Sequence, residues 1–318
     1  MASRRARRIS GTVVISSLIA LLPALGGAQD LSPRAYFPTP VSSNAVVLTY
    51  AFANGDIVLD PTLPIADVTG TIHSTVASYY HAFGLAGRSA NVTGSFPVVF
   101  ADLRGTVIGE QRTAHRVGQG DVFVRLAVNL AGGPARTVAE FLKAPKIRAL
   151  LGTSLKVVAP TGQYDPTLLI NIGTNRWAFK PEVGYLARVR GLVIESYAGV
   201  WFFTANHAYF AASPGAPGAV RTQDPIGAFE AHVSYDVTPR LWISGDVNYW
   251  HGGRTSVNGV PAAMLQANSR LGVTGSLPLS RRQSIKISYS DGLVVRLGGR
   301  FRVLSAGWQY GWIGRRFR

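Results

Sequence analysis

The sequence predicts an all-β fold, an antiparallel transmembrane β-barrel of about twelve strands with short periplasmic turns and long extracellular loops. Three observations predict it. Only 15% of the 318 residues are charged although 47% are hydrophobic, and soluble proteins usually carry about 25% charged residues. Apolar and polar residues alternate with period two through many short segments. The connections between these segments alternate between short and long, which is typical of barrels that cross a membrane.

The first 28 residues resemble a secretory signal peptide, so we expect the chain to be exported. Residues 4–8 supply a basic start, residues 12–25 form a short apolar stretch, and residues 26–28 are small. The mature chain is then expected to begin at Gln29. The apolar stretch is too short to cross a membrane as a helix, and no later apolar run reaches about 18 residues.

Period-two alternation defines the expected strands. In residues 121–130, Val124 and Leu126 share one face of the strand while Phe123 and Arg125 share the other. The same alternation is clear in residues 176–185, 226–237, 241–250, 268–277, 284–290 and 304–312, and weaker in residues 46–52, 72–83, 90–98, 151–160 and 192–204. The total is twelve, and bacterial barrels have an even number of strands.

The lengths of the connections predict two different ends of the barrel. The short connections are residues 84–88, 188–191, 238–240 and 278–282, and the long ones are residues 53–70, 99–120, 161–175, 205–224 and 251–266. One connection that should be short, residues 131–150, is long, and its part 137–150 is expected to form a short amphipathic helix on the periplasmic side. Loops 161–175 and 205–224 contain apolar residues, so one of them could fold inward as a constriction, or they could pack on lipid or on their neighbours. The expected division is residues 1–28 as signal peptide, 29–45 as an N-terminal periplasmic segment and 46–318 as the barrel.

The polar face of the strands favours a water-filled lumen over the solvated face of a soluble sandwich, because it mixes small polar residues with charges of both signs. The candidate lumen-lining residues are Arg125, Lys156, Arg176, Lys180, Glu182, Glu195, Glu230, His232, Asp246 and Arg270. Lys180 and Glu182 are two residues apart on one strand and therefore point the same way. We expect a ladder of salt bridges there. It could serve only to stabilise the fold, since buried charges usually pair, or it could set the selectivity of a pore, as rings of charge do.

Several segments carry a resemblance to a known family. They are residues 83–90, 158–164, 173–182, 199–204, 223–225 and 268–272, among which the stretch ending Lys180-Pro181-Glu182 is the most specific. From about Leu48 to its end, the chain resembles the outer-membrane β-barrel family of the meta-pathway of phenol degradation. The resemblance implies transport of small aromatic or hydrophobic compounds and implies no catalytic residues.

The charge and the residue types exclude several other classes. The formal net charge is +16, but the basic residues are scattered over strands and turns, so nucleic acid is not expected as a partner. The chain has no cysteine and six histidines, and no histidine pair has the close spacing of metal ligands. We therefore expect no metal and no cofactor. The expected partners are outer-membrane lipid, lipopolysaccharide and a small-molecule solute.

The function predicted from the sequence is an outer-membrane channel of a Gram-negative bacterium, for passive uptake of small aromatic or hydrophobic compounds. One alternative is a closed structural or adhesive barrel. A second is an outer-membrane hydrolase with its active site at the rim, because Ser234 and His232 share one strand face. No Gly-x-Ser-x-Gly motif, P-loop or dinucleotide fingerprint is present, so an enzyme is not expected.

Overall fold

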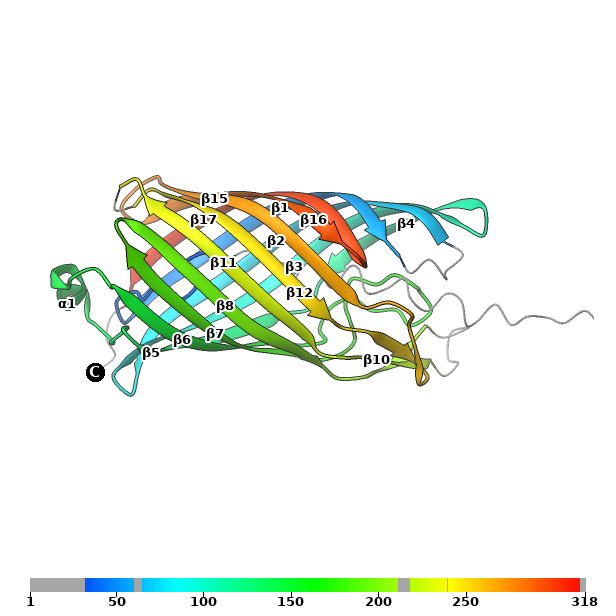
Figure 1. Cartoon of the computed structure of the whole chain (residues 1–318), viewed down its shortest axis with the longest axis horizontal. Coiled ribbons are helices and arrows are strands. Elements are labelled where there is room, and N and C mark those ends of the chain that lie inside the picture. The colour runs from blue at the N-terminus through cyan, green and yellow to red at the C-terminus, as the bar shows by residue number, and fades with distance from the viewer. Residues whose placement is uncertain (1–31, 60–64, 211–217, 239, 315–318) are drawn as a thin grey trace, which may run out of the picture.

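The computed structural model describes residues 32–59, 65–210, 218–238 and 240–314 and shows a closed antiparallel β-barrel (Figure 1). The expected signal peptide lies outside the described residues. The elements are β1 (Ser43–Val58), β2 (Ile65–Leu85), β3 (Arg88–Val107), β4 (Glu110–Gln119), β5 (Phe123–Ala131), α1 (Val138–Lys143), β6 (Ala149–Val158), β7 (Ala178–Val189), β8 (Leu192–Phe203), β9 (Asn206–Tyr209), β10 (Ala219–Gln223), β11 (Ile226–Asp236), β12 (Trp242–Gly252), β13 (Thr255–Val257), β14 (Val260–Pro261), β15 (Gln266–Pro278), β16 (Gln283–Val295) and β17 (Gly298–Ile313).

The barrel closes because β1 pairs with β2 on one side and with β17 on the other. The remaining neighbours follow one another along the chain in antiparallel pairs. β4 and β5 occupy one position in the barrel, because both pair with the same edge of β3. β4 pairs with residues 98–107 of β3, and β5 pairs with residues 90–95. The barrel therefore has twelve strands, as the sequence predicts.

The outer surface is apolar. Leu271 and Val273 on β15 are 51% and 59% exposed, whereas Arg270, the neighbour that points inward, is 2% exposed. The same inversion of the usual burial pattern holds on every side of the barrel, with Leu48, Phe100, Phe229 and Trp308 exposed on other strands. A surface of this kind is stable against hydrocarbon, where a closed barrel leaves no strand edge unpaired. The described residues contain no helix long and apolar enough to cross a membrane.

Four of the expected long loops are partly strand. β3 and β4 form one long hairpin that turns at Ile108 and Gly109, whose φ angles of 51° and 81° are those of a tight hairpin turn. β1 likewise continues to Val58, the connection after β8 contains β9 and β10, and the connection after β12 contains β13 and β14. The expectation that residues 53–70, 99–120, 205–224 and 251–266 are loops throughout is therefore wrong. Beyond the hydrocarbon, lipid no longer imposes alternation, so these strand ends do not show it.

The helix is shorter than expected. α1 begins after Thr137, which forms a capping box with Glu140. It ends at Lys143 because Ala144 precedes Pro145, and a helical conformation is unfavourable for the residue before a proline. Residues 149 and 150 already belong to β6, so the expected helix 137–150 was too long. α1 lies at the end of the barrel that has the short turns, on the left in Figure 1.

Residues 32–42, the described part of the expected N-terminal segment before β1, lie inside the barrel. We had expected residues 29–45 to stand outside it, but β1 already begins at Ser43. Residues 32–42 enter the lumen at the short-turn end, where Tyr36 is 1% exposed and Arg34 bonds to β11. The physical reason is that this stretch brings an aromatic ring and a guanidinium group to a lumen that can bury and pair them.

Candidate functional site in the barrel lumen

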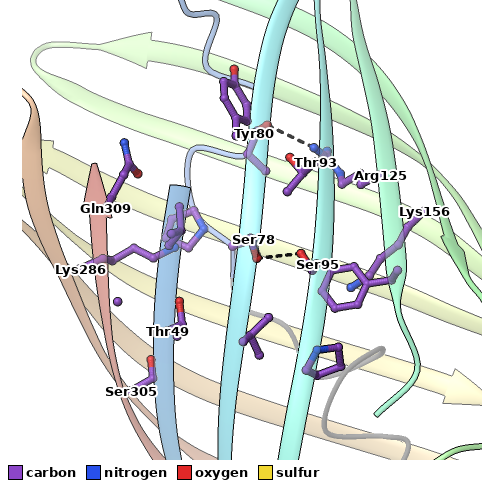
Figure 2. Close-up of a pocket in the computed structure, with 18 of the residues that line it drawn as sticks. Thr49, Ser78, Tyr80, Thr93, Ser95, Arg125, Lys156, Lys286, Ser305 and Gln309 are labelled. Carbon is purple, nitrogen blue, oxygen red and sulfur yellow. Dashed lines mark hydrogen bonds between the residues drawn. The ribbon is translucent and has the colours of Figure 1, made fainter. Parts of the chain in front are cut away.

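One half of the lumen is hollow. One side of its wall is formed by the inner faces of β1, β2, β3, β16 and β17, which carry small side chains such as Thr49, Ser78, Thr93, Ser95 and Ser305 (Figure 2). The hydroxyls of Ser78 and Ser95 are hydrogen-bonded at 2.8 Å. The cavity along this wall has a volume of about 1610 Å³, which exceeds the roughly 300–1,000 Å³ of ordinary ligand pockets.

The other half of the lumen is filled by charged side chains that pair across strands. Lys180 on β7 lies 2.6 Å from the Glu182 carboxylate and 3.0 Å from that of Glu230 on β11. Arg125 on β5 lies 3.7 Å from Glu182. The structure thus brings four of the candidate residues into one connected group that spans β5 to β11.

His232 extends this group toward β12. Its Nδ1 atom lies 2.8 Å from Asp246, and its Nε2 atom lies 3.6 Å from Glu230. Thr274 on β15 donates a hydrogen bond of 2.6 Å to Asp246, and Arg270 on the same strand donates one of 3.0 Å to Ser290 on β16. The candidate residues on β11, β12 and β15 therefore form a continuous polar layer inside the barrel.

Three cations lie in register on adjacent strands. In the backbone register, Arg125 on β5 is directly opposite Lys156 on β6, and Lys156 is directly opposite Lys180 on β7. Like charges directly opposite one another on neighbouring strands are unfavourable. Glu182 relieves part of this repulsion, and Lys156 also lies 4.1 Å above the Phe123 ring, a favourable cation–π geometry.

Tyr36 of the N-terminal segment rests on a pair of glycines. Gly152 on β6 and Gly184 on β7 are directly opposite each other, and the Tyr36 ring lies against both. A Cβ atom at Gly184 would lie 2.3 Å from the ring, and one at Gly152 would lie 2.4 Å from it. The Tyr36 hydroxyl donates a hydrogen bond of 2.8 Å to Glu182. Only glycine at both positions leaves room for the ring.

Arg34 fixes the same segment to β11. Its guanidinium group donates to Asp236 at 2.6 Å and to Ser234 at 3.0 Å. Its backbone N–H donates to Glu195 at 3.1 Å, and Glu195 also accepts a hydrogen bond of 2.5 Å from Tyr197. Glu195 therefore stands apart from the Lys180 group and serves as an anchor for the N-terminal segment.

The long-loop end of the lumen holds an apolar cluster. Its wall residues include Ile72 on β2, Leu103 on β3 and Phe301 on β17, and they pack against Ile170 from the β6–β7 loop and Tyr209 on β9. β9 belongs to the connection between β8 and β11, on the far side of the barrel from β1 and β2. Both loops that could fold inward therefore reach across this end of the lumen.

Two buried arginines lie next to this apolar cluster. Arg176, in the connection just before β7, is 7% exposed, and Arg221 on β10 is 5% exposed. Arg176 lies 4.4 Å above the Phe203 ring and donates a hydrogen bond to Gln223. The sequence indicated Arg176, but Arg221 was missed because it lies in an expected loop. Arg34 and Tyr36 were missed for a similar reason, since their segment has no periodicity.

The rim-hydrolase geometry is not formed. A serine hydrolase requires its histidine within hydrogen-bond distance of the serine hydroxyl. The ring nitrogens of His232 face Asp246 and Glu230, while the Ser234 hydroxyl accepts hydrogen bonds from Arg34. Among the described residues, no group of three or more histidine, aspartate or glutamate side chains could hold a metal ion.

The closed twelve-strand barrel with an apolar belt and a polar lumen defines the class of outer-membrane β-barrel folds. The chain belongs to the family described as "Putative MetA-pathway of phenol degradation", whose model matches residues 50–302. An outer-membrane channel from Pseudomonas putida F1 is similar in fold, with a TM-score of 0.72 at 17% identity over 89% of this chain and 100% of that one. The beta domain of the Bordetella autotransporter BrkA gives a TM-score of 0.51 at 12% identity over 85% of this chain and 100% of that one. No curated protein matches the chain.

Proposed function

We propose that the protein is a channel in the outer membrane of a Gram-negative bacterium for passive uptake of small aromatic or hydrophobic compounds. The observation that carries the proposal is the cavity along β1–β3, β16 and β17. It runs from Arg282 and Ile313 at the short-turn end to Ile172 and Arg221 below the apolar cluster. A barrel built only as a scaffold would gain stability from filling this volume with side chains.

The family membership and the similarity in fold to an outer-membrane channel support this proposal. In this arrangement the short turns face the periplasm and the long β3–β4 hairpin faces outward, toward lipopolysaccharide. The hydroxyl-rich wall of the cavity gives a solute hydrogen-bonding partners, and Val47, Val76 and Val303 on the same wall give it apolar contacts. A wall of this composition suits a small molecule with an apolar body and a polar group.

The candidate lumen residues have a role in this proposal. Lys180, Glu182, Glu230 and Arg125 form the charged wall that a passing solute faces, and we propose that they set ion preference as well as stabilise the barrel. The pairs are short and mostly buried, so their net effect on stability is small compared with the effect of removing one partner.

Single-channel conductance tests the channel. The mature protein is refolded, its folding is checked by heat-modifiable gel mobility, and it is inserted into a planar bilayer with and without phenol. Discrete conductance steps that phenol reduces are the expected result. A folded protein that never conducts, at any voltage or phenol concentration, would contradict the proposal.

One observation favours a closed barrel as the second candidate. The N-terminal segment occupies the short-turn end of the lumen, and the cluster around Tyr209 occupies the other end. If both are permanent, the barrel is a structural or adhesive element with a closed lumen. Conductance that appears only when residues 29–40 are deleted would support this second reading over a constitutive channel.

A further inference from the structure

The cavity wall is strongly basic. Among the described residues that line it, eleven are lysine or arginine and three are aspartate or glutamate. The basic residues extend over the whole length of the cavity, with Arg281 and Lys286 near the short-turn end, Lys156 in the middle and Arg221 at the long-loop end. A low-dielectric channel lined by one sign of charge concentrates ions of the opposite sign. An anion is therefore favoured along the entire passage.

The buried arginines Arg176 and Arg221 provide the most specific place for that anion. Arg221 and Gln223 are two residues apart on β10 and share a face, and Arg176 donates a hydrogen bond to Gln223. The two guanidinium groups are therefore neighbours. Burial and the nearby Arg221 charge lower the pKa of Arg176, which lies outside the strands of the barrel. A bound anion would relieve this repulsion.

Each guanidinium group also has a buried N–H to offer. Nη1 of Arg176 and Nε of Arg221 have no hydrogen-bond partner among the described residues, although nearly all buried donors in proteins have one. The neighbouring carboxylate, Asp121, accepts hydrogen bonds from Gly162 and Thr174 and so holds the β6–β7 loop in place. Its charge lies close enough to favour the cationic form of Arg176 but gives these two N–H groups no hydrogen bond.

The surroundings of this pair are apolar and aromatic. Phe203 lies beneath Arg176 and Tyr209 lies 5.3 Å from Arg221, while Ile172 and Ile226 line the same part of the cavity. We propose that Arg176 and Arg221 bind the carboxylate of a small aromatic acid on its way through the barrel. The ring of the acid would pack against the apolar wall, and its carboxylate would accept from the two guanidinium groups, which match it geometrically.

This inference rests on the proposed channel function, but its test does not depend on conduction. Binding of sodium benzoate, benzamide and sodium acetate to the refolded full chain is measured by titration calorimetry in detergent. Benzoate is expected to bind at least about 10-fold more tightly than either other probe, since benzamide lacks the charge and acetate lacks the ring. Arg221→Gln is expected to weaken benzoate binding about 10-fold or more. Lys146→Gln, which removes the same charge from an exposed site outside the lumen, is expected to leave it unchanged.

The outcomes separate the two proposals. Equal binding of benzoate and benzamide, or wild-type affinity in Arg221→Gln, would overturn the arginine site even if the barrel conducts potassium chloride. Equal binding of benzoate and acetate would overturn the aromatic part. Benzoate binding by a barrel that never conducts would support the site and contradict the channel. If Arg221→Gln fails to fold by gel mobility, Arg176→Lys replaces it, because lysine keeps the charge but loses the two-pronged geometry.

Discussion

A methyl group added at Gly184 is expected to displace Tyr36 and to raise conductance through the barrel. The new Cβ atom would lie 2.3 Å from one ring carbon and 2.5 Å from the next. Carbon atoms in ordinary contact are about 3.5 Å apart or more, so the ring must move by roughly 1 Å. Gly184 lies on a strand paired on both sides, so the ring and not the backbone is expected to yield.

The size of the effect follows from the bonds that the displacement breaks. The Tyr36 hydroxyl is hydrogen-bonded to Ser154 at 2.9 Å and donates to the Glu182 carboxylate at 2.8 Å. A neutral bond contributes about 1 kcal/mol and one to a charged group about 1.5–3 kcal/mol. Their loss shifts the balance between the seated and released segment by about 3 kcal/mol, or about 100-fold.

Two assays measure that shift. Gly184→Ala is expected to show larger or more frequent conductance steps than the wild type. Because the chain has no cysteine, a Phe37→Cys background gives a single labelling site on the segment, and its labelling rate with a water-soluble thiol reagent is expected to rise. Gly94→Ala is the matched control, since a Cβ atom there would meet nothing within 4 Å. Unchanged conductance and labelling in a folded Gly184→Ala variant would refute the inference that Gly152 and Gly184 make room for the Tyr36 ring.

Four further changes test other parts of the structure. Glu182→Gln removes the carboxylate between Arg125 and Lys180, so the reversal potential in a salt gradient is expected to move toward that of chloride, and an unchanged potential would contradict a role in ion preference. Tyr209→Ala opens the apolar cluster and is expected to increase conductance. Asp246→Asn leaves the buried His232 with one carboxylate partner instead of two, and should destabilise the barrel by about 3 kcal/mol, seen as a lower temperature of gel-mobility conversion. Leu271→Arg places a charge on the lipid face and should cost about 2–4 kcal/mol if the residue lies at mid-membrane, measured by urea unfolding in lipid vesicles; no loss would contradict the assigned outer face.

The strand faces were predictable because two solvents act on each strand at once. Apolar side chains are stable against lipid on one face of the strand, and polar side chains are stable in the lumen on the other. Period-two alternation therefore places Arg270 inside and Leu271 outside. The candidate lumen residues could be chosen for the same reason. Where a strand leaves the hydrocarbon, as in the β3–β4 hairpin, contact with lipid ends and the pattern fades.

The parts that were missed depend on contacts between distant segments. Gly152 and Gly184 are two of 35 glycines, and only the register of β6 against β7 sets them side by side. Tyr36 belongs to a segment with no alternation, so nothing in its neighbourhood indicates burial. Arg221 lies on a five-residue strand outside the barrel sheet, too short for a periodic signal.

The seat of Tyr36 also has a consequence for the order of folding. Tyr36 bonds to residues 118 and 146 positions further along the chain, and Arg34 to residues 200 and 202 positions further. The segment precedes along the chain every strand that will hold it, and its contacts can form only after β6 to β11 have assembled. Contacts of such long separation form late, because the ordering of the intervening chain must come first. Docking of the N-terminal segment should therefore occur only in a completed barrel and appear as a slow last phase of refolding. Gly184→Ala would abolish that phase and leave the earlier phases intact.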